Sequence, residues 1–265
     1  MLFRSLRSLA RGLKLNHNIG ALALVGSGEY TEPLLDLERE LIEIAKRKGK
    51  NGPYVQFATA AGEEHADRIE YWKNLGAVQA KRLGIESVFI PVLNREDALD
   101  PKWISQIKGA SLIYFSGGDP LHLATSLINT DLLTAIIGEH KSGTSLGGCS
   151  AGAMAMCSHV GMPWRSNSKK CEGFHLISNY QVLPHFDRFF SAIPSAFLRQ
   201  FPRFTHENVI GIDEKTALLW NGDSWIVRGH GGVHFFNQNR ERNSFHQNDV
   251  LDFLPIPYQN NGSEI

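Results

Sequence analysis

The sequence predicts an α/β protein in which helices cover both faces of a mostly parallel central sheet, a three-layer sandwich. From residue 21 onward, short apolar runs of strand length alternate with amphipathic stretches of helical length. Strands joined by helices imply right-handed crossovers, which place successive strands parallel to one another. The expected strands are 21–25, 54–58, 87–92, 110–115 and 144–148.

The clearest helical stretch follows the first expected strand. Its apolar residues recur at the spacing of one helix face, and its charged residues are expected to face away from the core. The apolar set is Leu34, Leu37, Leu41 and Ile44, and the charged set is Asp36, Glu38, Arg39 and Glu40.

The last part of the chain follows a different pattern. Short apolar runs are separated there by turn residues such as Asn221, Gly222 and Asp223, which predicts antiparallel hairpins added to the same sheet. A helical stretch around 195–201 precedes them. The apolar runs are 209–212, 216–220, 225–227 and 233–236.

Most of the 265 residues are assigned to a single α/β domain over 21–255, between an N-terminal extension at 1–20 and a polar tail at 256–265. The extension is amphipathic and contains four basic residues and no acidic one. This pattern is typical of an organellar transit peptide, and also of a segment that packs loosely on its domain or lies on a membrane surface. The expected location is the cytoplasm, with a mitochondrion or another organelle as the alternative if 1–20 is a transit peptide.

Composition excludes several classes of protein. The 27 Lys and Arg residues balance 27 Asp and Glu residues, which argues against a nucleic-acid-binding protein. No apolar run approaches the roughly 18 residues of a transmembrane helix. Cys149, Cys157 and Cys171 form no pattern of a disulfide scaffold or a metal site. Residues 26–28 lack the third glycine of a dinucleotide fingerprint at Thr31, so neither a cofactor nor a metal is expected.

Ligands of an open parallel sheet bind beyond the carboxyl ends of its strands. The loops that leave the expected strands are therefore where a site should lie. Four of these loops carry glycine beside small or polar residues, namely 26–29, 59–62, 116–119 and 147–152.

The strongest motif is Gly148-Cys149-Ser150-Ala151-Gly152, which fits the G-x-S-x-G pattern of a nucleophile elbow. It lies between an expected strand and an expected helix at 151–156, which is the context that such an elbow requires. Ser150 is the candidate nucleophile. A motif centred on Cys149 would need glycine at position 151, so Cys149 is expected to be a small buried side chain under the turn.

A serine nucleophile needs a base and a carboxylate that orients the base. Among eleven histidines, His185 stands out because it follows a strand-like run at 180–183 and Pro184. The candidate acids are Glu172, the pair Asp213 and Glu214 at a turn between two expected strands, and Asp187, which is too close in sequence to His185 to orient it easily.

Four segments, taken in order, resemble the cyanophycinase and aspartyl dipeptidase (dipeptidase E) serine peptidase family. They are 117–119, 148–153, the His185-Phe186 dipeptide and 211–217. The resemblance implies a class I glutamine amidotransferase-like, flavodoxin-like fold. It also implies that Ser150 is the nucleophile, His185 the base and Glu214 the acid, with Asp213 as the alternate acid. The backbone amides of Gly118 and Ala151 are implied to form the oxyanion hole.

The resemblance is weaker where a substrate would be held. Asp119-Pro120 replaces the amide residue that often follows the paired glycines, and Arg188 alone represents an arginine-rich stretch. Asp119 and Arg188 remain candidate substrate-binding residues. The expected function is a serine-type peptidase or amidohydrolase acting on a small peptide or amide, such as an aspartyl or β-aspartyl one. The alternative is a catalytically inactive module that binds a small molecule or a protein, and the sequence allows a homodimer.

Overall fold

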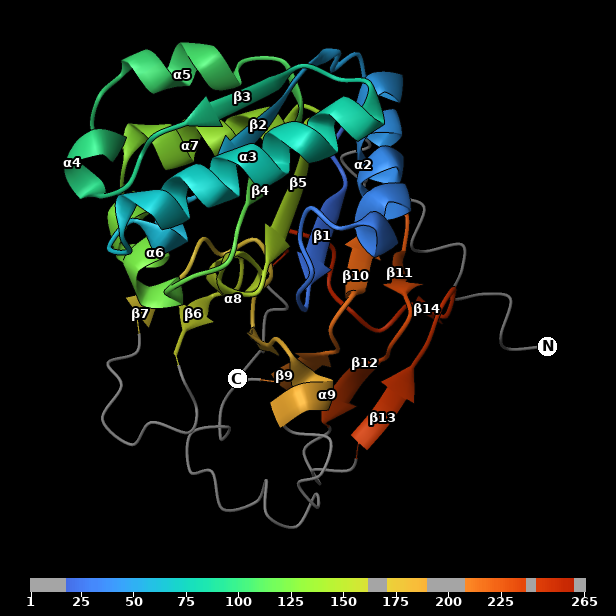
Figure 1. Cartoon of the computed structure of the whole chain (residues 1–265). Helices are drawn as coiled ribbons and strands as arrows, with labels where there is room; N and C mark the ends of the chain where they lie inside the picture. Colours follow the sequence, from blue (N-terminus) through green and yellow to red (C-terminus); the bar gives the residue numbers. More distant parts are fainter. Residues whose placement is uncertain (1–17, 162–170, 190–207, 237–241, 260–265) are drawn as a thin grey trace.

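The computed structural model describes residues 18–161, 171–189, 208–236 and 242–259. Most of the basic extension at 1–20, the helical stretch at 195–201 and the end of the polar tail lie outside the described residues. The chain forms a central eight-stranded sheet in the order β14-β11-β10-β1-β5-β4-β2-β3, which lies among the helices in Figure 1. Its parallel strands are β1 (Leu22–Val25), β2 (Gly52–Phe57), β3 (Ser87–Ile90), β4 (Ala110–Phe115) and β5 (Ser145–Cys149).

Helices cover both faces of this sheet, and alternate residues of each strand point into one of two cores. Leu22 and Leu24 of β1 join the core beneath α6, α7 and α8, whereas Ala23 and Val25 join the core beneath α2 and α3. The predicted three-layer α/β fold is therefore confirmed. The helical segments are η2 (Glu32–Leu34), α2 (Leu35–Arg47), η3 (Thr59–Ala61), α3 (Ala66–Leu83), α4 (Arg95–Ala98), α5 (Lys102–Ile107), α6 (Pro120–Leu127), α7 (Asp131–Lys141), α8 (Ala151–Ala155) and α9 (Phe186–Phe189).

The C-terminal strands divide between two sheets, which the sequence pattern alone placed in one. β10 (Thr216–Trp220), β11 (Trp225–Gly229) and β14 (Val250–Leu251) extend the central sheet antiparallel. A second sheet has the order β13-β12-β9-β8 and consists of β8 (Tyr180–Leu183), β9 (Asn208–Ile212), β12 (Val233–Phe236) and β13 (Arg242–Phe245). In Figure 1 the second sheet and α9 lie on the side toward which the β5 arrow points. A short pair, β6 (His159–Val160) and β7 (Cys171–Glu172), completes the described strands.

Glu38 corrects the sequence prediction, which placed it on the solvent face of α2. Its side chain is fully buried because α3 packs against that side of α2. Gln79 of α3 and Tyr54 of β2 lie close to this carboxyl and favour its charged form, but they do not offset the burial. Burial raises the pKa of this carboxyl to about 8.

We expect Glu38→Gln to stabilise the protein, and the gain to grow with pH. Because the folded-state pKa lies above the unfolded one, the folded protein binds the extra proton between about pH 4.5 and pH 8, and wild-type stability falls as pH rises through this window. Gln is neutral throughout, so its advantage in the free energy of unfolding should grow by roughly 1–3 kcal/mol from pH 5 to pH 8. Urea unfolding at both pH values measures the difference, and a pH-independent difference would contradict the prediction.

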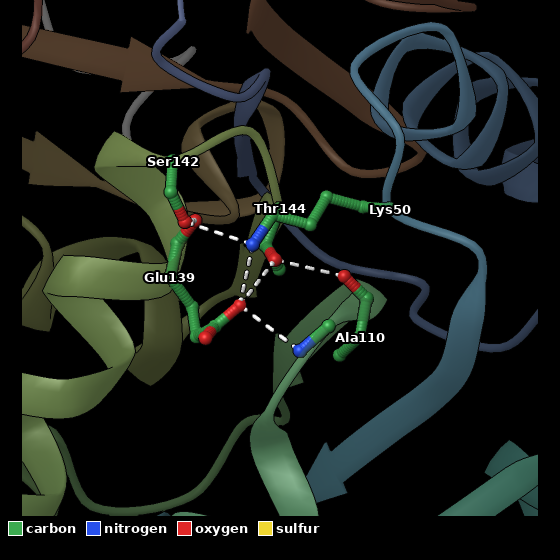
Figure 2. Close-up of polar contacts among 6 residues, drawn as sticks. Lys50, Ala110, Glu139, Ser142 and Thr144 are labelled. Atoms are coloured by element: carbon green, nitrogen blue, oxygen red, sulfur yellow. Dashed lines mark hydrogen bonds and ion pairs between the residues drawn. The ribbon is translucent and has the colours of Figure 1, made fainter.

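Figure 2 shows a cluster of polar contacts at the amino ends of β2, β4 and β5. Lys50 Nζ donates to Glu139 Oε2 at 2.7 Å and to Ser142 Oγ at 2.8 Å. Thr144 Oγ1 donates to the Ala110 carbonyl at 2.8 Å and lies 3.3 Å from Glu139 Oε2. The cluster ties α7 to the strand ends opposite the loops in which a site is expected, so its role is to stabilise the sheet.

The two ends of the described chain meet at His140 of α7. His140 Nε2 contacts the Gly20 carbonyl at 3.0 Å, and its Nδ1 contacts the Tyr258 hydroxyl at 2.6 Å. Burial lowers the pKa of His140 to about 4, so the ring is neutral at physiological pH. The beginning of the predicted polar tail thus packs on the domain.

No single helix of the described ranges combines the length and the apolarity of a membrane span; α6 and α7 meet those criteria only when taken together, as a pair bent by 95°.

Candidate active site

Ser150 occupies the turn between β5 and α8, as the sequence predicts. Its backbone adopts φ 50° and ψ −107°, a strained conformation for a residue with a side chain. Glycines make the turn sterically feasible. A Cβ on Gly148 would lie 2.6 Å from the Gly152 carbonyl carbon, and a Cβ on Gly152 would lie 2.4 Å from the Phe115 carbonyl oxygen. Strand, turn and helix therefore approach one another closely and raise Ser150 at the carboxyl end of the sheet.

Cys149 points to the other side of the turn and is fully buried. Its thiol donates to Glu29 Oε2 at 2.9 Å. Burial, together with the adjacent Glu29 carboxylate, raises the pKa of the Cys149 thiol well above its ordinary value. A thiol held protonated and covered is a poor nucleophile, which agrees with the sequence-based preference for Ser150 over Cys149.

His185 lies within hydrogen-bond distance of Ser150. It follows β8, takes φ 52°, and precedes α9. Its Nε2 is 3.1 Å from Ser150 Oγ. The amides of Arg188 and Phe189 donate to the His185 carbonyl, so the first turn of α9 holds the histidine backbone in place.

Glu214 completes the contact on the other side of the histidine ring. Its Oε1 lies 2.8 Å from His185 Nδ1, and its backbone amide donates to Asp187 Oδ1 at 3.0 Å. Asp187 therefore docks the turn between β9 and β10 onto α9. The hydrogen bond with His185 lowers the pKa of Glu214 below its ordinary value, so Glu214 is ionised at neutral pH.

Asp213, the alternate acid, contacts a different histidine. His234 Nε2 lies 3.0 Å from Asp213 Oδ1, and the Gly232 amide donates to Asp213 Oδ2 at 2.7 Å. Burial raises the pKa of Asp213, but the hydrogen bonds from His234 and Gly232 outweigh burial and place it below its ordinary value. Glu172 lies in β7, and no hydrogen bond or ion pair joins it to His185 in the part of the chain that the structure describes. The geometry therefore favours Glu214.

Two backbone amides near Ser150 are free to bind an anion. In the loop after β4, Ser116 N donates to the Phe57 carbonyl, Gly117 N to Glu29 Oε1 and Asp119 N to the Ala60 carbonyl. Gly118 N, like the Ala151 N at the start of α8, donates to no acceptor within the described ranges. Gly118 has φ 144°, and a Cβ there would lie 2.3 Å from a carbonyl oxygen of η3, so only glycine fits.

The two candidate substrate-binding residues make contacts of their own. Asp119 Oδ1 accepts the amides of Leu121 and His122 and so caps α6. Arg188 has a largely exposed side chain whose Nη1 lies 3.8 Å from Glu214 Oε1. Both side chains lie beside the candidate site, and their contact with a substrate stays a prediction.

Sequence reasoning did not single out Glu29 or His234 as parts of the site, and it considered Asp187 only as a candidate acid. Glu29 could have been found, because it closes one of the four loops at the carboxyl ends of the strands. His234 carries no such signal, and the contact of Asp187 with the Glu214 amide could not be foreseen, since both depend on how the second sheet packs beside the central one. Across the described ranges, no group of three or more His, Cys, Asp or Glu side chains is placed to hold a metal ion.

The fold agrees with comparisons to known proteins. The chain belongs to peptidase family S51, whose family model matches residues 22–228. This membership confirms the resemblance seen in the four sequence segments.

Two curated relatives have the same sequence identity to this chain. A protein named cyanophycinase from Trichormus variabilis is 27% identical over 206 residues, which cover 71% of this chain and 64% of that protein. A protein named peptidase E from Nostoc sp. is 27% identical over 162 residues, covering 56% of this chain and 64% of that protein. The match thus spans slightly less than two thirds of the length of each relative.

Two solved structures are also similar. The crystal structure of a peptidase from an acI-B1 Actinobacterium has 46% identity and a TM-score of 0.80, and the match covers 89% of this chain and 98% of that one. A putative peptidase E from Listeria monocytogenes has 16% identity and a TM-score of 0.53 over 80% of this chain and all of that one, a likeness of fold alone.

Proposed function

We propose that this protein is a serine-type peptidase or amidohydrolase that cleaves a small peptide or amide through an acyl-enzyme on Ser150. The observation that carries the proposal is the continuous series of contacts from Ser150 Oγ through the His185 ring to Glu214, at 3.1 Å and 2.8 Å. Membership of peptidase family S51 supports the same reaction class. The assembled contacts favour this hydrolase over a catalytically inactive binding module.

In the proposed mechanism, the ionised Glu214 accepts a hydrogen bond from the Nδ1–H group of His185. This contact leaves Nε2 unprotonated and directed at the Ser150 hydroxyl. His185 takes the hydroxyl proton as Ser150 Oγ attacks the substrate carbonyl carbon. His185 then gives this proton to the leaving amine. In the second half of the reaction His185 takes a proton from water as the water attacks the acyl-enzyme, and returns it to Ser150 Oγ as the acyl group is released.

The amides of Gly118 and Ala151 are the proposed oxyanion hole. Both are free donors near Ser150, one in the loop after β4 and the other at the first residue of α8. Charge develops on the carbonyl oxygen only as the tetrahedral intermediate forms, so donors fixed in advance stabilise the transition state more than the bound substrate.

For the substrate we propose a small peptide or amide that carries a carboxylate. Arg188 lies at the exposed side of Glu214, where its guanidinium could pair with such a group. The resemblance of the four sequence segments to the cyanophycinase and aspartyl dipeptidase family favours an acidic substrate of the aspartyl or β-aspartyl type. Assembly as a homodimer and a cytoplasmic location remain predictions.

The experiment that tests the proposal is a hydrolysis screen of the purified full chain against α-aspartyl, β-aspartyl and neutral dipeptides. We expect release of free amino acids from at least one acidic class, and faster than from the neutral dipeptides. Equal rates for all classes would contradict the proposed specificity. No hydrolysis of any class, together with no labelling by a fluorophosphonate, would contradict the proposed activity.

A further inference from the structure

The end of β1 and the loop that follows it, residues 25–30, hydrogen-bond to the segments that carry the parts of the candidate site other than the histidine. The last residue of β1, Val25, accepts the Ser150 amide at 2.9 Å through its carbonyl. Ser27 accepts the Lys215 amide at 3.0 Å, directly after Glu214. Glu29 hydrogen-bonds to the loop after β4 (residues 116–119, the oxyanion loop) and to the turn between β5 and α8 (residues 148–152, the nucleophile turn). One short loop therefore holds the segments that carry the nucleophile, the acid and an oxyanion donor.

Glu29 is the only side chain of this loop that we find bonded both to the nucleophile turn and to the loop after β4, within the described residues. Its Oε1 accepts the Gly117 amide at 2.9 Å and its Oε2 accepts the Cys149 thiol at 2.9 Å. Glu29 as a whole is only 8% exposed. A Cβ on Gly117 would lie 2.9 Å from Glu29 Oε1 and 3.4 Å from Ser150 Cβ, so Gly117 is enclosed between the carboxylate and the nucleophile.

We propose that Glu29 is a positioning residue, which fixes the Gly118 amide of the oxyanion hole relative to Ser150. The inference rests on the proposed function and deepens it. Glu29 acts through two neighbours: Gly117 directly precedes Gly118, and Cys149 directly precedes Ser150. A single carboxylate thus links the nucleophile to the donor that must face the developing oxyanion.

The need for such a link follows from the flexibility of paired glycines. Gly117 and Gly118 can adopt conformations closed to other residues, so this loop holds one geometry only if it is anchored. The Ala60 carbonyl anchors the far side of Gly118 by accepting the Asp119 amide at 2.7 Å, and Glu29 anchors the near side. Loss of the near anchor would let the Gly118 amide drift, and an oxyanion donor displaced by about 1 Å loses much of its effect.

The test measures phosphonylation of Ser150 by a fluorophosphonate, because the phosphoryl oxygen of the adduct needs the same donors. Glu29→Ala and the volume-matched Glu29→Met remove the acceptor, whereas Glu29→Gln keeps a carbonyl that can accept the Gly117 amide. We expect the maximal labelling rate to fall about 10–100-fold in Glu29→Ala and Glu29→Met, with half-saturating probe concentration within about threefold of wild type. Glu29→Gln should restore the rate to within about fivefold.

The matched control is Glu139→Ala. Glu139 belongs to the polar cluster at the opposite end of the sheet, so its loss should lower Tm and leave the maximal labelling rate within about twofold of wild type. If the Glu29 variants lose labelling only in proportion to the fraction of protein that is unfolded at the assay temperature, Glu29 is a structural residue and the proposal is wrong.

A second measurement reads the anchor without the reaction. Hydrogen exchange of the Gly117 amide, followed by NMR of protein labelled with 15N-glycine, should be protected in wild type and Glu29→Gln and unprotected in Glu29→Met. Retained protection in Glu29→Met would overturn the proposal. The proposed function fails by a separate result, namely labelling of wild type that persists in Ser150→Ala, so the two failures are distinguishable.

Discussion

We expect Ser150→Ala to abolish fluorophosphonate labelling and to lower kcat/KM by at least about 10³-fold, with little change in Tm. The Ser150 hydroxyl is the group that His185 Nε2 contacts at 3.1 Å, and no other hydroxyl stands at the turn between β5 and α8. Alanine keeps the backbone, so the fold should be retained. Mass spectrometry of the labelled protein and steady-state kinetics on the fastest dipeptide measure the two effects.

Cys149 provides the competing outcome. Its thiol is buried, bonded to Glu29 and held protonated, so it should not be modified in wild type. Labelling at Cys149, or turnover retained in Ser150→Ala but lost in Cys149→Ser, would show that the nucleophile is the cysteine.

The second large effect is expected at the acid. Glu214→Gln should lower kcat about 10²–10⁴-fold, because an amide can present its NH₂ group to His185 and favour the tautomer with the proton on Nε2. Asp213→Asn should retain turnover to within about tenfold and instead lower stability by about 1–3 kcal/mol, since Asp213 pairs with His234. Kinetics and urea unfolding of both variants separate these outcomes.

The pH dependence of the same comparison follows from the Glu214 pKa. Its contact with His185 lowers the folded-state pKa, so the favourable interaction is fully present above the unfolded value of about 4.3 and is lost as pH falls through the folded value. Glu214 should therefore stay ionised between pH 5 and pH 8, and its contribution to the free energy of unfolding should be lost only below about pH 4.3, which urea unfolding of wild type and Glu214→Gln across this range measures. Full activity of Glu214→Gln together with inactivity of Asp213→Asn would show that the acid is Asp213.

The residues near Ser150 show how far sequence reasoning reaches. A G-x-S-x-G motif between an apolar strand and a helix restricts Ser150 to a strained turn, because the small residues are needed where strand and helix nearly touch. His185 and the Asp213-Glu214 pair could be placed at strand ends by the same local patterns. Their catalytic roles stay predictions, although the structure brings Ser150, His185 and Glu214 into contact.

Longer-range packing was not predictable in the same way. The sequence pattern treated Glu38 as a solvent-facing residue of an amphipathic helix, since one apolar stripe was enough to explain α2. The structure buries Glu38 because α3 covers a second side of that helix. The C-terminal apolar runs likewise showed strands and turns, but not that β9 and β12 would join β8 in a second sheet.

The sequence by itself determined the α/β class, the alternation of strands and helices along the chain, and the glycine turn that presents Ser150. These features depend on hydrophobic period and on local steric limits, both of which can be read from neighbouring residues. Only the tertiary structure decided which carboxylate faces His185 and that Glu29 joins the oxyanion loop to the nucleophile turn. Asp213 and Glu214 are adjacent and chemically alike, and only the packing of the second sheet, with His234 on one side and His185 on the other, directs them apart.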